Sequence, residues 1–488
     1  MSLGKSVAKG ALWLVLLRLL NKTIGLISTL VLVRLLAPED FGIVAIAMSL
    51  FALIDLISRF GFDTVLIQKE TISRNDYDTA WTLNFCFGFL ACLLLFLLSF
   101  PVSIFYENKD LKTVLMVISL MFLINGMQNI GVVDFRKNLT FDKEFKLLFF
   151  PKILSFFITI ALAFSLRSYW ALVFGSLIWK ILEVANGYIL HSYRPSLSLS
   201  SWRELYNFSK WLFINNLFMF LYTKTPELVV GKILTPQAVG FLTVSHEVST
   251  LPTAELASNI NRAAYPGYSK VAKDVNELNS LYLGVMSSIA IFAYPAGIGL
   301  AVVSDSLVPV FLGEQWLDAA YLIKYLAIVG LLFAINSNTG YVFLAVGKPR
   351  VLSIISLVRV LIFIPCLILL THFYGLHGSA QALLISAIAV FFLYHYLMYF
   401  KLSISLYEII LVHIRPFLSS IMMGTIVYIF GSYFLMTGLM SDYLVLACSV
   451  VLGIALYTSF LLLFWFLFHK PDGPEKNFIK IIRNKLNH

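Results

Sequence analysis

Charged residues are scarce in this chain of 488 residues, at 13%, whereas hydrophobic residues make up 59%. A soluble domain typically has about 25% charged residues, so a soluble protein this apolar could not cover its surface. The apolar residues fall in runs of about 18 or more, enough for a helix to cross a hydrocarbon core roughly 30 Å thick. The alternating ten-residue segments of a membrane β-barrel are missing. The composition therefore predicts an all-α membrane protein.

Cysteine and catalytic motifs are equally sparse. The four cysteines, Cys86, Cys92, Cys366 and Cys448, lie in apolar runs and have neither zinc-site spacing nor a disulfide framework. Walker A, Gly-x-Ser-x-Gly, His-Glu-x-x-His and Gly-x-Gly-x-x-Gly motifs are absent. The triplet Asp76-Tyr77-Asp78 resembles the metal-binding DxD of many glycosyltransferases, but no nucleotide-binding domain surrounds it. We expect a solvated charged loop there, and no enzyme, metal or cofactor.

Hydropathy predicts about fourteen membrane spans joined by loops of at most about twenty residues. The predicted spans are residues 11–36, 41–58, 80–105, 112–133, 148–166, 169–190, 211–233, 238–259, 279–303, 319–346, 351–370, 378–400, 416–436 and 443–468. The loops are too short to contain a soluble domain. Only the basic tail, residues 469–488, is clearly outside the membrane.

The basic residues predict the orientation. With a cytoplasmic N-terminus, 24 of the 36 lysines and arginines fall on the cytoplasmic side, as the positive-inside rule requires. An even number of spans then places the C-terminus in the cytoplasm as well. The net charge of +10 therefore reflects topology and some attraction to anionic lipid, and nucleic acid is not an expected partner.

One short motif occurs twice. Residues 33–42, VRLLAPEDFG, and residues 231–240, GKILTPQAVG, share a basic residue, two apolar residues, a small residue, proline and a final glycine, at an offset of 198 residues. That offset contains six spans, so both halves enter the membrane with the same orientation. The sequence predicts two parallel six-helix lobes, residues 1–200 and 201–405, followed by two additional helices within residues 406–468.

Ionisable residues at bilayer depth are costly and mark candidate functional sites. Lys180 and Glu183, like Lys224 and Glu227, are three residues apart on one helix face, so each pair can neutralise itself. Lys152 can extend toward the cytoplasmic helix end. Because self-neutralised pairs can be structural, a functional and a structural role are both open for these residues.

Arg18 and Lys22 differ from those pairs because they lie four residues apart on one face and have the same charge. Acidic residues of other spans, a water-filled cavity or an anionic substrate must neutralise them, with Asp55 as one candidate partner. In the second half of the chain, 198 residues later, the equivalent positions are Asn216 and Phe220, so the repeat does not require the cations. Arg359 has no acidic residue three or four positions away in its span. Phosphate suits such cations, and the predicted substrate-binding residues are therefore Arg18, Lys22, Arg359, Lys180 and Lys224.

Other polar residues in the spans can titrate during a transport cycle. The candidates for coupling to a proton or sodium gradient are Asp55, Glu227, His246, Glu247 and Glu255. A buried hydrogen-bonded pair explains the adjacent His246 and Glu247 equally well.

From about residue 2 to 470 the sequence resembles the Wzx-type polysaccharide flippases of the MOP (multidrug/oligosaccharidyl-lipid/polysaccharide) superfamily, especially their colanic-acid-exporter-like branch. The resemblance rests on the order and spacing of seven segments: RLLAPEDFG (34–42), FGFD (60–63), IQK (67–69), RKNLTF (136–141), YPGYSK (265–270), FLGEQW (311–316) and GKP (347–349). It implies two six-helix lobes around a central cavity with two extra C-terminal helices. It also implies that Arg18 and Lys22 grip a pyrophosphate.

The implied function is ion-coupled export, by alternating access, of an undecaprenyl-pyrophosphate-linked oligosaccharide across the bacterial inner membrane for surface polysaccharide synthesis. Expected partners are that lipid-linked oligosaccharide, membrane lipid and other polysaccharide-assembly proteins. A cation-coupled multidrug exporter of the same superfamily is the alternative, although the cations of the first span disfavour a cationic drug. A membrane-embedded polymerase or ligase is disfavoured because the outside loops are short.

Overall fold

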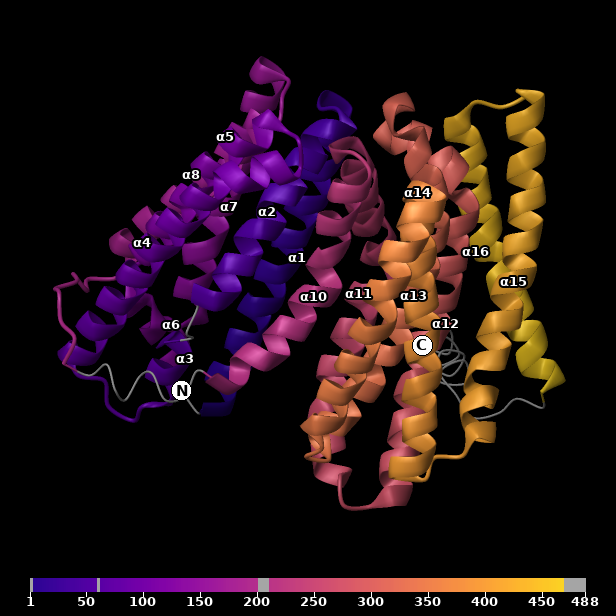
Figure 1. Cartoon of the computed structure of the whole chain (residues 1–488). Helices are drawn as coiled ribbons and strands as arrows, with labels where there is room; N and C mark the ends of the chain where they lie inside the picture. The colour runs from indigo at the N-terminus through magenta and orange to yellow at the C-terminus, as the bar shows by residue number, and fades with distance from the viewer. Residues whose placement is uncertain (1–2, 59–61, 201–209, 469–488) are drawn as a thin grey trace. The chain divides into compact units, whose positions relative to one another are not determined.

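The computed structural model describes residues 3–58, 62–200 and 210–468, and these are helical without any strand. The longer helices are α1 (Leu3–Leu35), α2 (Pro38–Ser58), α4 (Arg74–Phe105), α5 (Lys109–Gly126), α7 (Phe141–Leu166), α8 (Trp170–Leu190), α10 (Lys210–Ile233), α11 (Pro236–Val271), α12 (Val275–Leu307), α13 (Leu317–Ala345), α14 (Pro349–Leu402), α15 (Leu406–Thr437) and α16 (Asp442–Leu467). Short helices α3 (Phe62–Gln68), η1 (Ile130–Val132), α6 (Val133–Lys137), η2 (Val308–Leu312) and η3 (Glu314–Trp316) connect them (Figure 1). The predicted all-α fold class is confirmed.

Among the described residues, nine helices are long and apolar enough to cross a membrane, or ten if the bent segment Lys109–Lys137 counts as one span. Each of the fourteen predicted spans coincides with a helix or with half of α14. However, α2, α10 and α11 are not among the nine. The multi-pass membrane architecture is thus established, and the number fourteen stays a prediction.

Helix α14 is 54 residues long, far more than one membrane crossing needs, and it is broken at Gly375. This glycine has φ 61° and ψ −140°, a backbone conformation that side chains with a Cβ do not tolerate. A Cβ on Gly378 would lie 1.9 Å from the Leu370 carbonyl oxygen, so the chain also packs tightly just past the break. The break falls between the predicted spans 351–370 and 378–400.

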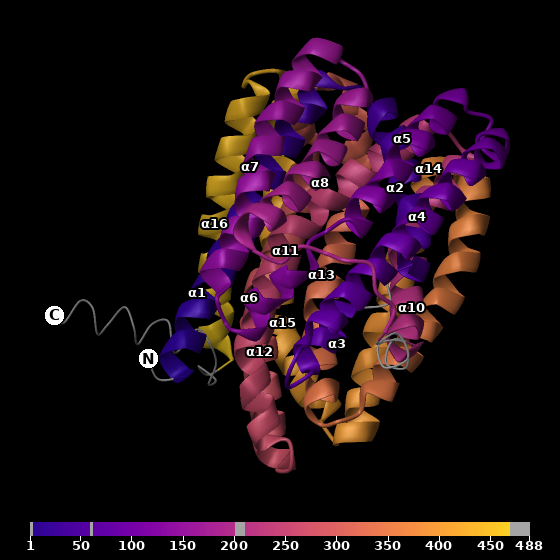
Figure 2. The same ribbon diagram turned by 90° about the vertical axis from the view of Figure 1, so that its left-hand side faces the viewer.

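The chain divides into two compact units, Met1–Gly240 and Phe241–His488. In the first unit α4 packs against α5, α7 packs against α1 and α8, and α10 packs against α2 (Figure 2). In the second unit α12 packs against α13, α15 and α16, and α13 packs against α14. The predicted lobes with a boundary at residues 200 and 201 stay a prediction.

The two copies of the repeated motif contact each other at the ends of α2 and α11. A Cβ on Gly42 would lie 1.6 Å from the Pro236 carbonyl oxygen, and a Cβ on Gly240 would lie 1.8 Å from the Pro38 carbonyl oxygen. Each glycine therefore lets the backbone of the other copy approach closely. The repeated proline and glycine are therefore explained by a tertiary contact between the two copies, which neither copy reveals alone.

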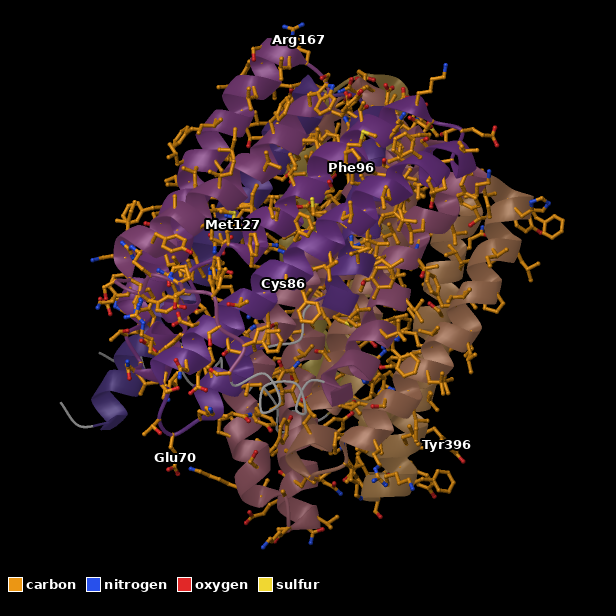
Figure 3. The ribbon with its side chains drawn as sticks, turned by 60° about the vertical axis from the view of Figure 1, so that its left-hand side comes forward. Glu70, Cys86, Phe96, Met127, Arg167 and Tyr396 are labelled. Carbon is orange, nitrogen blue, oxygen red and sulfur yellow. The ribbon has the colours of Figure 1, made fainter. Side chains whose placement is uncertain are left out.

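The first unit presents apolar side chains outward along most of its length. Helix α4 exposes Phe89, Leu93, Phe96 and Leu97, among others, as a helix facing lipid must. Figure 3 shows Phe96 between Arg167 at one end of the unit and Glu70 at the opposite end. These two charged residues lie at predicted outer and inner loops, respectively.

Candidate functional site

Helices α1 and α7 run alongside each other, and their contacts fix their relative register. Gly10 lies against the Phe141 ring, and the rings of Trp13 and Phe145 are 4.9 Å apart. Leu32 and Ala163 belong to the same buried cluster farther along. In the Gly10–Phe141 and Trp13–Phe145 contacts the α7 residue number is larger by 131 and 132, respectively.

The same offset places Arg18 and Lys22 of α1 level with the part of α7 that contains Lys152. Arg18 is half-buried and Lys22 is exposed at its position on α1. Arg18, Lys22 and Lys152 also take part in interactions with other residues of the chain. The two cations predicted from their spacing on α1 therefore share their depth with a third basic residue from another helix.

Helix α8 adds a fourth basic side chain at this depth. The Nζ atoms of Lys152 and Lys180 lie 5.0 and 4.9 Å from the ring centroid of Trp179. A cation over an indole ring is stabilised by the ring quadrupole. Lys180 Nζ also lies 2.8 Å from Glu183 Oε2, and both side chains are largely buried. Lysines of α7 and α8 thus converge on one tryptophan.

Trp179 has a further feature that bears on ligand binding. Its indole Nε1 is buried and has no hydrogen-bond acceptor among the described residues. A buried N–H group without an acceptor is costly, and an anionic oxygen would satisfy it. We refer to Arg18, Lys22, Lys152, Trp179 and Lys180 as the basic layer of the first unit. Sequence reasoning missed Trp179, because an indole within an apolar run gives no signal of its own.

The second predicted pair has a different environment. Lys224 Nζ lies 2.9 Å from Glu227 Oε1, and Ser49 Oγ of α2 donates a 2.8 Å hydrogen bond to Glu227 Oε2. Glu227 is buried, whereas the Lys224 side chain is 35% exposed. Both carboxylate oxygens are therefore occupied. The pair fastens α10 to α2.

The remaining predicted site residues are dispersed. Asp55 is half-buried on α2 in the first unit, and His246, Glu247, Glu255 and Arg359 belong to the second unit. On α11 the side chains of His246 and Glu247 are exposed, and Glu255 is half-buried; Arg359 is half-buried on α14. All five interact with other residues. Their roles in substrate binding or ion coupling stay predictions.

The expectation of a solvated loop at Asp76-Tyr77-Asp78 is wrong. Both aspartates are 3% exposed, at the start of α4. Asp76 forms a capping box with Ser73 and lies 2.8 Å from Lys69 Nζ. Buried carboxylates need such partners, and these come partly from a distant segment of the chain.

That distant segment is the stretch that follows α8. The Tyr193 hydroxyl and the Ser196 hydroxyl donate hydrogen bonds of 2.6 and 2.7 Å to the Asp78 carboxylate. A tyrosine hydroxyl is already protonated at neutral pH, and burial and the bond to Asp78 raise the pKa of the Tyr193 hydroxyl further. The triplet is a structural anchor for residues 193–198.

Comparison with known proteins identifies the family. Residues 31–321 match the model of a family described as polysaccharide biosynthesis protein, which is more than half of the chain. The chain belongs to this family. The predicted resemblance to a polysaccharide biosynthesis family is thereby confirmed.

Individual members agree with this assignment. The lipopolysaccharide biosynthesis protein WzxC of Escherichia coli (strain K12) is 27% identical over 379 residues, which is 76% of each chain. The teichuronic acid biosynthesis protein TuaB of Bacillus subtilis (strain 168) is 23% identical over 354 residues, 71% of this chain and 73% of TuaB.

A solved structure shows the fold of this polysaccharide biosynthesis family member. The lipid II flippase MurJ in an inward closed conformation superposes with a TM-score of 0.76 at 17% identity, covering 94% of this chain and 99% of MurJ. The helical fold is similar to that of MurJ over nearly the whole chain.

Proposed function

We propose that this chain is a flippase that moves an undecaprenyl-pyrophosphate-linked oligosaccharide across the bacterial inner membrane for surface polysaccharide synthesis. The relatives WzxC and TuaB are named for lipopolysaccharide and teichuronic acid biosynthesis, and MurJ is named a lipid II flippase. Transport by alternating access requires no covalent chemistry, which agrees with the lack of catalytic motifs in the sequence.

The basic layer is the observation that carries this proposal. Arg18 and Lys22 from α1, Lys152 from α7 and Lys180 from α8 supply four cations at one depth of the first unit. Cations within the bilayer are expensive, at about 2.5–3.5 kcal/mol each on insertion scales, unless an interaction compensates them. A pyrophosphate offers several anionic oxygens that guanidinium and ammonium groups bind well.

In this proposal the basic layer holds the pyrophosphate while the polyprenyl tail stays in lipid. The buried Trp179 Nε1–H donates to a phosphate oxygen. The Nζ atoms of Lys152 and Lys180 lie 5.0 and 4.9 Å from the centroid of the same ring. The substrate-binding role of Arg359 stays a prediction from the sequence, and Lys224 is paired with Glu227 on its own helix. Ion coupling, a cytoplasmic location of both termini and association with polysaccharide-assembly proteins belong to the same proposal.

The experiment replaces Arg18 and Lys22 together with alanine in a strain whose surface polysaccharide depends on this chain. We expect at least a hundredfold loss of surface polysaccharide with an unchanged amount of the protein in the membrane, because two charge-assisted contacts are removed. Arg34→Ala is the matched control, since Arg34 lies on the same helix in its last turn. Full polysaccharide in the double variant would contradict the proposal.

A further inference from the structure

Two histidines that the sequence analysis did not single out lie side by side in the second unit. His395, on the part of α14 after the break, and His413, on α15, have ring centroids 5.5 Å apart. They are only 7% and 9% exposed. The Phe391 ring lies 4.2 Å from His395 and 6.0 Å from His413, and the Tyr294 ring of α12 lies 5.8 Å from His413. The pair is enclosed mainly by aromatic side chains.

Each imidazole uses one nitrogen and leaves the other without a partner. His395 Nδ1 lies 2.7 Å from the Phe391 carbonyl oxygen. A carbonyl oxygen can only accept, so Nδ1 carries the hydrogen and Nε2 of the neutral ring has a lone pair. His413 Nδ1 lies 3.2 Å from the Tyr294 hydroxyl. Both Nε2 atoms are buried with no hydrogen-bond partner among the described residues. Packing alone does not require this, because an apolar side chain would leave no polar atom unsatisfied.

A single proton serves both rings when His413 Nδ1 donates to the Tyr294 hydroxyl, because both Nε2 atoms then have a lone pair. A proton bound at one Nε2 makes an N–H group that can donate to the other Nε2 once the two rings turn toward each other. A second proton would place two cations about 5.5 Å apart in apolar surroundings, which strongly disfavours it. A metal ion fits less well, since no group of three or more histidine, cysteine, aspartate or glutamate residues among the described residues could hold one.

The other titratable groups near the pair do not replace it. Arg415 of α15 is buried two residues from His413, and its positive charge opposes each proton added to the pair. Tyr294 comes from α12 and Tyr394 from α14, while Tyr457 of α16 donates its hydroxyl to the Ile291 carbonyl oxygen. Farther along these helices lie other charged residues. The exposed ones are Glu277 and Asp305 of α12, Arg350 and Lys401 of α14 and Glu408 of α15, and the half-buried ones are Arg359 of α14 and Asp442 of α16.

Carboxylates are distributed very differently between the two units. The buried carboxylates of the described residues, Asp76, Asp78, Glu144, Glu183 and Glu227, all lie in the first unit. Among the described residues of the second unit, the buried imidazoles are those of His395 and His413. The sequence candidates His246 and Glu247 are exposed instead.

The pair also lies where a conformational change can act. His395 is on the half of α14 that follows the break at Gly375, and Ser403, with φ 57°, turns the chain from α14 into α15. A proton shared between His395 and His413 would tighten the contact between this half-helix and α15. Binding a ligand in one arrangement better than in another shifts the population toward that arrangement.

We propose that His395 and His413 together bind one proton, and that this proton is the coupling ion of the transport cycle. The second half of this statement rests on the flippase function proposed above, whereas the first half does not. These two residues lie on the neighbouring helices α14 and α15, whereas the coupling candidates predicted from the sequence are dispersed.

The first experiment measures proton binding without transport. The full chain is purified with isotope-labelled histidine, and its eight rings are titrated by NMR in lipid nanodiscs. His395→Gln and His413→Gln assign the two signals. We expect the two rings to change together and to take up one proton per chain. Two independent protonations, or none across the pH range in which the protein stays folded, would overturn the one-proton site.

The second experiment measures coupling in cells whose surface polysaccharide depends on this chain. We expect each glutamine variant to lower the polysaccharide at least tenfold at unchanged membrane abundance, and the residual export to become insensitive to a protonophore. The matched control is His372→Gln, an exposed histidine on α14. If His413→Gln fails to accumulate, His395→Gln on the other helix gives the same test.

The two failures can be told apart. Wild-type polysaccharide and an unchanged protonophore response in His395→Gln would overturn the coupling role, whatever the NMR titration shows. If instead the Arg18 and Lys22 double variant exports normally while the NMR titration still finds one shared proton, the flippase mechanism fails and the proton site stands.

Discussion

Two lysine–glutamate pairs with the same spacing, Lys180–Glu183 on α8 and Lys224–Glu227 on α10, have different surroundings. The ionic contacts are alike, at 2.8 and 2.9 Å. Glu227, however, also accepts a hydrogen bond from Ser49 of α2. Glu183 has no such additional bond among the described residues, and its lysine shares Trp179 with Lys152.

This difference separates a structural role from a binding role. In the α10 pair one positive charge balances one negative charge. Both carboxylate oxygens of Glu227 accept a hydrogen bond, one of them from Ser49 on the neighbouring helix, so the pair stabilises the packing of α10 on α2. The α8 pair belongs to the basic layer, where lysines outnumber carboxylates around one indole ring. We therefore expect Lys180 to contact the substrate and Lys224 to act mainly on stability.

The largest effect should follow from Glu227→Ala. The change leaves Lys224 without its carboxylate partner, whereas the Ser49 hydroxyl can still donate to the Ala45 carbonyl oxygen. Breaking one side of a buried pair costs about 3 kcal/mol, and the 35% exposure of the Lys224 side chain makes this an upper limit. We expect a lower thermal unfolding midpoint of the purified protein and a smaller amount in the membrane. Export per molecule should stay close to wild type. An unchanged midpoint would contradict the structural role of this pair.

A matched pair of double variants tests the comparison itself. Lys180→Met with Glu183→Gln, and Lys224→Met with Glu227→Gln, each remove a pair without leaving a buried charge. We expect the α8 double variant to lower export about tenfold, which corresponds to about 1.4 kcal/mol in the rate-limiting step. The α10 double variant should lower export less than twofold once membrane abundance is taken into account. Equal losses in both variants would remove the distinction between the pairs.

The features that were predictable from sequence are local. Apolar length determined where the helices lie, and the spacing of three residues determined both lysine–glutamate pairs, because each depends on a single helix. The break in α14 was predictable from the gap between two apolar runs around Gly375. The repeat was visible because both of its copies are continuous segments.

The features that were missed depend on contacts between distant segments. Asp78 is buried because Ser196, 118 residues later, donates to it. His395 and His413 lie in different helices, and nothing in either local sequence indicates the other ring. Lys152 and Trp179 meet only because α7 and α8 pack together. Side-chain partners of this kind cannot be inferred from periodicity.

The smallest effect, and the one most specific to the α8 pair, should come from Trp179. Trp179→Leu removes the indole beneath Lys152 and Lys180 and also the buried Nε1–H, while keeping an apolar side chain. Cation–π contacts are worth about 0.5–1 kcal/mol each at such sites, so we expect export to fall roughly fivefold with little change in stability. Trp179→Phe retains the ring and loses only the donor, so it should lie between wild type and Trp179→Leu. Export in Trp179→Phe as low as in Trp179→Leu would assign the effect to the N–H alone, and no loss in either variant would exclude the indole from the site.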